Sequence, residues 1–337
     1  MTFSARKLPA LVLIALFPQA AASPLFEDDA VLEISIVGPL NSLIDEKKNR
    51  EELPFVLRAN DDEFPIKVRV RGKSRMRVCD FPPLRMNFSD DTTKQTVFAG
   101  QDKLKLVTHC RNGASDQAAV LKEYAAYKIF NLISDVSYKV RLARITYSDT
   151  DEGMQEASVD RYGFFIESSS ELAGRFGADV VQTAGVTLGS LDTQQAAAVF
   201  VFQYLIGNTD WSLVTADLDN TCCHNGDLFE IDSRRYYVPF DFDLSGLVDA
   251  RYARPDRSLR IRSVTQRRYR GYCISPEALK DAIRAISARK GDILGVVVQV
   301  PGFTEKDIST AVKYLDEFFE MTDDVDKLAK SFDRKCL

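Results

Sequence analysis

The feature that most constrains the fold is a change of periodicity near the middle of the chain. From about residue 30 to 167, β-branched and aromatic residues alternate roughly with polar ones, as strands require. Beyond about residue 190, apolar residues recur at helical spacing. The 337 residues are too many for one ordinary core. The sequence therefore predicts an α+β protein, in two domains or one bilobed unit, with a β-rich first lobe and a mainly helical second lobe.

The first lobe is expected over residues 30–167, as strands with one helix among them. Leu121, Ala125 and Ile129 recur at helical spacing, and Ser115 is expected to cap this helix of residues 115–133. The strands are expected in six segments of rough alternation, residues 31–38, 64–72, 82–88, 102–110, 138–147 and 161–168.

The second lobe is expected over residues 191–337, after a linker of residues 168–190 that is rich in small and polar residues. It begins with LDTQQAAAVFVFQYLIG, whose composition indicates a buried helix. Ser275, followed by a proline at the first helical position, and Thr304 are expected to cap two further helices.

The first 22 residues have the pattern of a secretory signal peptide. Arg6 and Lys7 precede an apolar segment around residues 10–17, and small residues follow as far as Ala22. We therefore expect cleavage and export to the periplasm or the medium; the alternative is an uncleaved N-terminal anchor. No later window reaches the roughly 18 apolar residues of a transmembrane helix, so no membrane span is expected after cleavage.

The six cysteines of an exported chain are expected to form disulfides. Six cysteines allow 15 pairings, and we expect Cys79 with Cys110 and either Cys222 or Cys223 with Cys273. The alternative is a zinc site that recruits a neighbouring histidine, but no CxxC spacing supports it.

The charge distribution excludes one class of function and leaves another open. A net charge of -5 argues against general nucleic-acid binding, which needs a basic field. Residues 251–270 nevertheless hold eight arginines and one acid. Arginine forks bind carboxylates and phosphates, so this segment either positions an acidic or phosphorylated protein substrate or is a solvated charged surface.

Carboxylates and an amide lie between apolar runs in residues 206–246. A helix that ends in GNTD and a strand that ends in FDFD would bring Asp210 and Asp241 to the same end of adjacent elements. Such a pair suits phosphoryl transfer, in which one carboxylate orients the attacking hydroxyl and another, with an amide oxygen, holds Mg²⁺. The alternative is that Asp210 caps a turn and that Asp241 and Asp243 flank a solvent-facing bend.

A lysine and a glutamate precede these acids in an order that supports the same chemistry. Lys105 lies on an expected strand, and Glu123 follows 18 positions later on the expected helix. A strand lysine that positions phosphates is held by a helix glutamate in protein kinases. We therefore expect Lys105 and Glu123 to form an ion pair.

The order of these segments resembles a known family. VRVRGKSR, EYAAYKIFNLI, RYGFFIESSSELAGRFG, IGNTD and VPFDFDLSG occur in sequence and resemble the spore-coat CotH kinases. More remotely they resemble the HipA-type and other atypical members of the protein-kinase-like fold. The similarity spans about residues 30–246. It implies a bilobed kinase-like fold and transfer of a phosphoryl or nucleotidyl group from Mg²⁺-ATP to a protein hydroxyl.

The resemblance also implies roles for single residues. Asp210 would be the catalytic base, Asp241 the main Mg²⁺ ligand and Asp243 a second ligand, while Lys105 would position the phosphates. The family's strand turn in the first lobe would be formed by Arg71, Gly72 and Ser74. The hinge against adenine would be lined by Phe164, Phe165, Ile166 and Glu167, with backbone groups contacting the base.

The sequence departs from the family pattern at the metal-binding amide. An Asn about five residues after the catalytic Asp is usual, whereas Asn225 follows Asp210 by 15 positions. Either an insertion separates them in sequence alone, or Asn220 serves, or the metal site is degraded; Cys222 and Cys223 within the insertion suggest a disulfide that pins it. There is also no clear glycine-rich phosphate loop.

Several functions remain open on the sequence alone. Besides the exported kinase, the chain can be a pseudokinase that acts as a secreted binding protein, because ATP is scarce outside the cell. A metal-assisted hydrolase using Asp210, His224 and Asp241 ranks last, since it leaves Lys105 and Glu123 unexplained. We expect His224 and His109 to be hydrogen-bonded structural residues and Trp211 to pack in the core.

Overall fold

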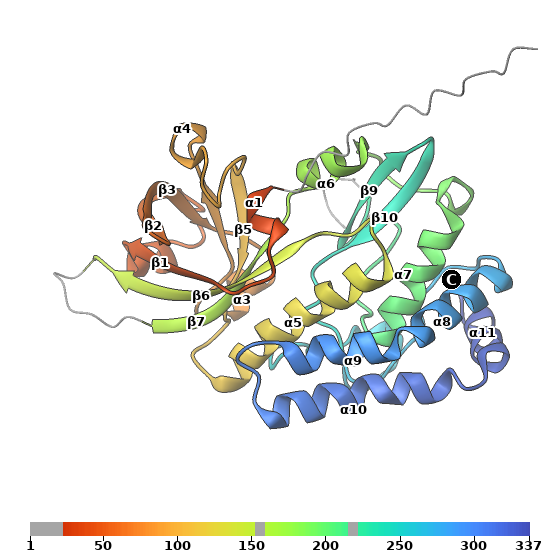
Figure 1. Ribbon diagram of the computed structural model, residues 1–337. Helices are drawn as coiled ribbons and strands as arrows, with labels where there is room; N and C mark the ends of the chain where they lie inside the picture. Colours follow the sequence, from red (N-terminus) through yellow and green to blue (C-terminus); the bar gives the residue numbers. More distant parts are fainter. Residues whose placement is uncertain (1–22, 152–158, 215–221) are drawn as a thin grey trace, which may run out of the picture.

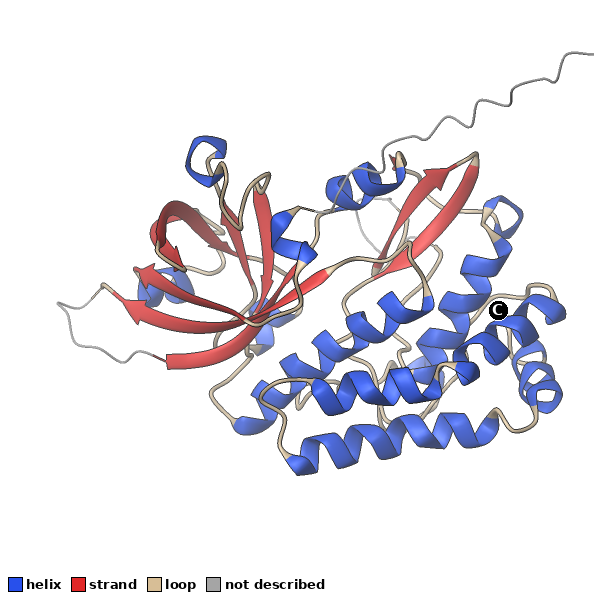
Figure 2. Ribbon diagram, in the orientation of Figure 1, coloured by secondary structure: helices blue, strands red, loops and turns tan. Residues whose placement is uncertain are grey.

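The computed structural model describes residues 23–151, 159–214 and 222–337. Strands fill one half of the molecule and helices most of the other, and the two halves lie side by side (Figure 1). A second, smaller group of strands stands on the helical half (Figure 2). The expected signal peptide and Asn220 lie outside the described residues.

The first half is a closed barrel in which neighbouring strands follow the order β1-β2-β3-β4-β5-β7-β6. Antiparallel pairs run around it, and a parallel pairing of β1 with β6 closes it, with Ile34 opposite Ile145. Its strands are β1 (Leu32–Gly38), β2 (Leu53–Ala59), β3 (Asp62–Val70), β4 (Leu84–Asn87), β5 (Lys103–Val107), β6 (Val140–Asp149) and β7 (Val159–Ile166). Each of the six expected segments overlaps one of these strands, and β2 was not predicted from the sequence.

The barrel core follows from the alternation of its strands. Successive side chains point to opposite faces, so Phe165 of β7 packs inside the barrel while Phe164 and Ile166 face the helical half. Phe98 contacts Phe165 with ring centroids 6.0 Å apart. Four short helices decorate the barrel: α1 (Pro24–Glu27), α2 (Leu40–Asp45), α3 (Arg75–Val78) and α4 (Asp90–Thr93).

The second half surrounds a larger hydrophobic core. The long helix α5 (Ala114–Ile133), although it interrupts the barrel strands in sequence, buries Leu121, Ala125 and Ile129 in this core. The other helices are α6 (Ser169–Phe176), α7 (Thr193–Leu205), α8 (Pro276–Ala288), α9 (Lys290–Gln299), α10 (Glu305–Met321) and α11 (Val325–Asp333). A small sheet of order β10-β9-β8 comprises β8 (Asp179–Val181), β9 (Gly226–Ile231) and β10 (Arg234–Pro239), and 3-10 turns cover Leu188–Ser190 and Arg257–Leu259.

Most expected helix starts are confirmed. Ser275 accepts a hydrogen bond from the amide of Ala278, and Thr304 forms a capping box with Asp307. The Ser115 cap is wrong, because α5 begins at Ala114 after Gly113. The expected linker of residues 168–190 contains α6 and β8, and the capping box at the start of α6 was a signal for a helix there.

One expected disulfide is confirmed and another is wrong. Cys79 bonds to Cys110, as expected, but Cys273 bonds to Cys336 rather than to Cys222 or Cys223, which bond to each other. The C-terminus lies beside Cys273, whose amide donates to the carbonyl of Leu337. Because all six cysteines form disulfides, no thiolate is left for the zinc alternative.

No helix of the described residues is long and apolar enough to cross a membrane. This agrees with the expectation that no span follows residues 1–22.

His109 is buried at the end of β5, where its ring stacks on Phe81 with centroids 4.7 Å apart and planes inclined by 11°. Burial, with repulsion from Arg161, lowers the pKa of His109 from 6.5 to about 4. The buried ring is therefore neutral at pH 7, as a structural histidine is.

Lowering the pH from 7.5 to 5 is expected to destabilise the folded state through His109. The folded-state pKa is depressed, so the unfolded chain binds the extra proton between about pH 6.5 and 4, and stability falls as the pH falls through that window. The loss attributable to His109 is about 2 kcal/mol at pH 5. Urea unfolding at both pH values measures it, with His109→Phe as the comparison. An equally large pH effect in the His109→Phe variant would contradict the assignment.

Candidate functional site

A small cavity lies where the barrel meets the helical half. Its volume is about 20 Å³, room for little more than one water molecule. The barrel contributes β5, β7 and the turn after β3, while α5 and the segment after β10 contribute the other wall. The lining residues are Arg71, Lys105, Val107, Glu123, Tyr127, Tyr138, Ile166, Phe240 and Asp241.

Lys105 and Arg71 bring two cations to the cavity. The ammonium of Lys105 lies over two aromatic rings, 5.6 Å from the centroid of Phe240 and 6.0 Å from that of Tyr138. Burial and the nearby charge of Arg71 lower the pKa of Lys105, while Asp227 and Asp241 oppose this shift. Within the described part of the chain, no carboxylate forms an ion pair with Lys105.

The expected ion pair between Lys105 and Glu123 is wrong, because Arg75 takes the glutamate. Arg75 Nη2 donates to both oxygens of Glu123, at 2.9 and 2.8 Å. Arg75 lies at the start of α3, directly after the turn that follows β3, so its side chain reaches α5 from the barrel. Only 6% of this residue is exposed.

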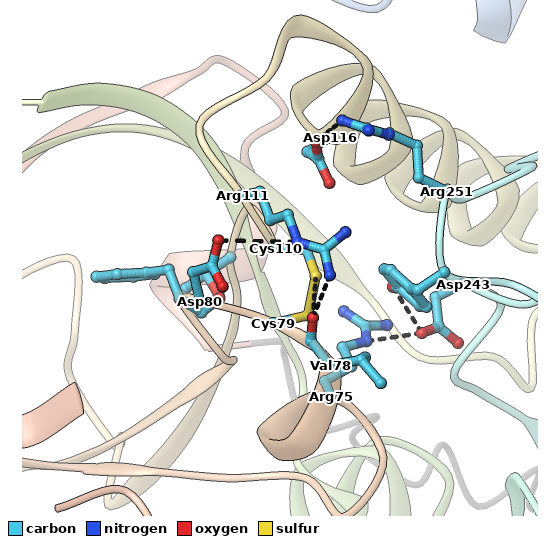
Figure 3. The surroundings of a disulfide bond; sticks show 12 residues. Arg75, Val78, Cys79, Asp80, Cys110, Arg111, Asp116, Asp243 and Arg251 are labelled. Atoms are coloured by element: carbon cyan, nitrogen blue, oxygen red, sulfur yellow. Dashed lines mark hydrogen bonds and ion pairs between the residues drawn. A yellow bond between two sulfur atoms is a disulfide. The ribbon is translucent and has the colours of Figure 1, made fainter. Parts of the chain in front are cut away.

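Arg75 also binds the two aspartates after β10. Its Nε donates to Asp243 Oδ2 at 2.8 Å and its Nη2 to Asp241 Oδ1 at 3.0 Å. Figure 3 shows the guanidinium pointing at Asp243, below the disulfide between Cys79 and Cys110. One cation thus joins the barrel, α5 and the segment after β10. We call Arg75, Glu123, Asp241 and Asp243 the arginine hub.

The charges of the arginine hub do not balance, since three carboxylates surround one guanidinium. Burial raises the pKa of Glu123 to about 8, against the attraction of Arg75 and with the support of the neighbouring aspartates. Burial likewise raises the pKa of Asp243 to about 6. The pKa of Arg75 is raised further by these carboxylates despite its burial. The guanidinium therefore stays charged, and the acids share the remaining protons.

Asp241 is presented to the cavity by an unusual backbone conformation. It follows β10 with φ of 61°, in the left-handed region that Asp and Asn tolerate better than most residues. Its amide donates to the hydroxyl of Tyr127 at 2.9 Å, and the next residue, Phe242, is fully buried. The Asp241 side chain is 43% exposed, so its carboxylate can meet a ligand.

The three expected metal ligands are not gathered around one point. Asp243 is only 4% exposed, and its Oδ2 also accepts a hydrogen bond from Tyr252 at 2.8 Å. Asn225 donates to Asp210 rather than facing Asp241. Among residues 23–151, 159–214 and 222–337, no three His, Cys, Asp or Glu side chains form a metal-binding group. The residues fit a site in which Asp241 is the one protein carboxylate, and Mg²⁺ accepts such a site when phosphates supply other ligands.

Asp210 is held by two side chains from the loop before β9. Its Oδ1 lies 2.9 Å from His224 Nε2, and its Oδ2 accepts a hydrogen bond from Asn225 Nδ2 at 2.9 Å. Backbone hydrogen bonds in both directions join Ser212 and His224, which fixes the loop against the Asp210 segment. Asn225 is therefore 15 positions from Asp210 in sequence but in contact with it, and His224 is hydrogen-bonded as expected. We call Asp210, His224 and Asn225 the Asp210 cluster.

The residues of the expected adenine hinge, 164–167, lie at the end of β7 and directly after it. β7 pairs with β5 on one side and β6 on the other, so the backbone around Phe164 and Ile166 is engaged in the sheet. The amide of Glu167 donates to the carbonyl of Lys139. The Glu167 side chain is 1% exposed and forms an ion pair with Arg175 at 2.7 Å, and Phe165 is buried inside the barrel. Of these four residues, Ile166 lines the cavity.

The expected turn after β3 is present. Gly72 has φ of 90°, which glycine adopts without strain, and Arg71 donates its amide to Pro83 at 2.8 Å. Arg71 lines the cavity, whereas Ser74 is exposed and makes no cap hydrogen bond at the start of α3. Trp211 is buried and stacks on Phe200, as expected.

Two functional contacts were missed from the sequence. Arg75 is the last letter of the quoted run VRVRGKSR, and nothing distinguishes it there from the other arginines. Tyr138, which lines the cavity, donates its hydroxyl to Asp227 at the start of β9. In the sequence, Tyr138 stands two residues before the strand β6. An aromatic residue at such a position is equally typical of the core, so the sequence did not indicate this contact.

The comparisons with known proteins add a fold-level likeness. No family model matches the chain, and no curated protein matches it. The chain is similar in structure to a Helicobacter pylori proinflammatory kinase, CtkA, at 12% sequence identity and a TM-score of 0.41, over 74% of this chain and 94% of the kinase chain. At this level the likeness carries no argument about function, and membership of the CotH family stays a prediction.

Proposed function

We propose that this chain is an atypical kinase that transfers a phosphoryl or nucleotidyl group from Mg²⁺-ATP to a hydroxyl of a protein substrate. The observation that carries the proposal is the cavity in which Lys105 and Arg71 meet Asp241. Two partly buried cations and one accessible carboxylate are what a metal-bound polyphosphate needs, because the cations neutralise phosphate oxygens and the carboxylate holds the metal.

The nucleotide cannot enter the cavity as it stands. Pockets for ligands of this size are typically about 300 Å³ or more, against about 20 Å³ here. The barrel and the helical half must therefore separate at the cavity. The hydrogen bonds of Arg75 to Glu123, Asp241 and Asp243 join the two walls. Mg²⁺ supplies charge neutralisation at the phosphates when bound, with Asp241 as its protein ligand.

The Asp210 cluster suits the acceptor side of the reaction. In the transfer step the substrate hydroxyl oxygen forms a bond to the phosphorus, the bond to the leaving nucleotide oxygen breaks, and the hydroxyl proton passes to a base. Asp210 is 38% exposed at its side chain, and its two oxygens are oriented by His224 and Asn225. We assign Asp210 as that base, and His224 and Asn225 as the residues that position it.

A second candidate is a pseudokinase that binds a partner without chemistry. The small cavity and the engagement of Asp241 by Arg75 favour it. The hydrolase alternative has less support, because Asp210, His224 and Asp241 do not form a metal-binding group among the described residues.

Replacing Asp210 by Asn is expected to lower transfer by about a hundredfold, since a positioned base contributes at least that much. The measurement uses ATP labelled at the γ-phosphate, with casein and the chain itself as acceptors, and ATP labelled at the α-phosphate in parallel to detect nucleotidyl transfer. Asp91→Asn, on the barrel surface with its side chain 88% exposed, is the matched control. Equal transfer by wild type and Asp210→Asn would remove Asp210 from catalysis. Nucleotide binding without any transfer would favour the pseudokinase.

A further inference from the structure

The segment of residues 251–270 is rich in arginine, and the arginines divide into two groups. Arg267 is internal: it forms an ion pair with Glu317 at 3.2 Å, and its guanidinium lies 3.8 Å from the ring centroid of Tyr314. Arg251 pairs with Asp116 at 3.7 Å (Figure 3). Four exposed arginines have neither a carboxylate partner nor a side-chain hydrogen bond within the described part of the chain, whereas exposed Arg254 donates to two backbone carbonyls. We call these four the arginine surface: Arg257, Arg260, Arg262 and Arg268.

We propose that the arginine surface docks an acidic polypeptide. The one acid of the segment, Asp256, is already engaged, because its Oδ1 accepts the amide of Ser258 at 2.7 Å. Unneutralised guanidinium groups repel one another, and a run of carboxylates relieves this repulsion while forming bidentate hydrogen bonds. Arg260 adopts φ of 54°, so an arginine occupies a left-handed position at which glycine is usually favoured.

The segment is held in place at both ends, so little order has to be gained on binding. At its start, Tyr252 donates to Asp243, and Ala253 and Val264 are buried together in a small core. At its end, Tyr269 stacks on Phe332 with centroids 4.1 Å apart, and the disulfide of Cys273 follows. A surface that is ordered before it binds loses less conformational entropy on binding.

The aromatic side chains of the segment favour a polypeptide over a nucleic acid. Single-stranded nucleic acids bind to basic surfaces that offer exposed aromatic rings for base stacking. Tyr269 is 3% exposed and stacked inside the fold, and the Tyr252 hydroxyl is bound to Asp243. The carboxylates of an acidic polypeptide bind to guanidinium groups without any aromatic stacking.

The position of the segment links docking to the candidate site. Tyr252 contacts Asp243, a member of the arginine hub, so the chain passes directly from the hub to the arginine surface. The first arginine of this surface, Arg257, follows Tyr252 by five residues, and the further statement that a docked polypeptide is the phosphate acceptor rests on the proposed function. Docking itself does not depend on that function.

The test measures binding of a fluorescein-labelled glutamate-rich peptide to the full chain by fluorescence anisotropy, without nucleotide, at about 0.15 M salt. The variant replaces all four arginines of the arginine surface by Gln. The matched control replaces four exposed arginines elsewhere by Gln and so changes the net charge equally: Arg58, Arg234, Arg284 and Arg289. A peptide with Gln in place of Glu and a single-stranded DNA of equal charge complete the probes.

We expect the glutamate peptide to bind wild type and the control variant alike, and the arginine-surface variant about tenfold or more weakly. The proposal would be overturned if the glutamate peptide bound equally weakly to both variants or did not bind to wild type. It would also be overturned if the Gln peptide bound to wild type, or if the DNA bound more tightly than the glutamate peptide. The Asp210→Asn variant should bind the glutamate peptide as wild type does, whether or not it transfers a phosphoryl group. Its peptide binding therefore tests docking separately from the proposed function. Retained docking in a protein without transfer would reject only the proposed function.

Discussion

Replacing Arg75 by Met is expected to destabilise the folded state by about 3–5 kcal/mol, the range for removing one partner of a buried ion pair. The substitution keeps most of the side-chain volume but leaves Glu123 and Asp243 buried without their cation. Their pKa values, already raised by burial, would rise further, and protonation would recover only part of the loss. Urea unfolding at pH 7 measures the difference.

Two comparisons isolate the cause of that loss. Arg58→Met removes an exposed ion pair with Glu63, whose side chains are 51% and 62% exposed, and should cost less than about 1 kcal/mol. Arg75→Met combined with Glu123→Met removes the cation and its closest carboxylate together, so it should be clearly more stable than Arg75→Met alone. A loss in Arg75→Met no larger than that in Arg58→Met would show that the arginine hub does not hold the two halves together.

The barrel was largely predictable because its strands alternate. In residues 64–72, Ile66, Val68 and Val70 are β-branched and stand at every second position, and burial of one face fixes the segment as a strand. β2, LPFVLRA, was missed because Pro54 stands within it, and proline lowers the expectation of a strand. Closure of the sheet by β1 and β6 depends on contacts between residues more than a hundred positions apart, and no local pattern encodes it.

The sequence predicted which types of residue line the site, but it did not predict which of them form ion pairs with one another. Lys105, Glu123 and Asp241 do line one cavity, as their order in the sequence suggested. The predicted partner of Glu123 was wrong. Whether Lys105 or Arg75 reaches Glu123 depends on where α3 lies after the turn that precedes it. The position of β7 between β5 and β6 likewise depends on strand pairings that no local pattern encodes.

Binding of Mg²⁺-ATP is expected to raise the free energy of unfolding by about 4.1 kcal/mol when the nucleotide is present at about 1,000 times its dissociation constant. The stabilisation arises because the folded cavity brings together Lys105, Arg71 and Asp241, which the unfolded chain does not. Asp241→Asn should lose most of this increment, because the amide removes the charge that attracts the metal. Asn also tolerates the left-handed backbone at this position, so the fold should persist.

A nearby aspartate provides the control for this substitution. Asp249 is exposed and adopts φ of 47°, so Asp249→Asn repeats the same chemical change on the same kind of backbone outside the cavity. It should leave both the ligand-free stability and the nucleotide increment unchanged. Asp241→Asn should leave the ligand-free stability unchanged or raise it, because it removes one of three crowded carboxylates.

The most direct test of a nucleotide site in this cavity is therefore the increase in unfolding free energy with Mg²⁺-ATP, measured by urea unfolding in wild type, Asp241→Asn and Asp249→Asn. We predict a large increase in wild type and Asp249→Asn and little in Asp241→Asn. An equal increase in all three proteins, or none in wild type at millimolar Mg²⁺-ATP, would contradict the account.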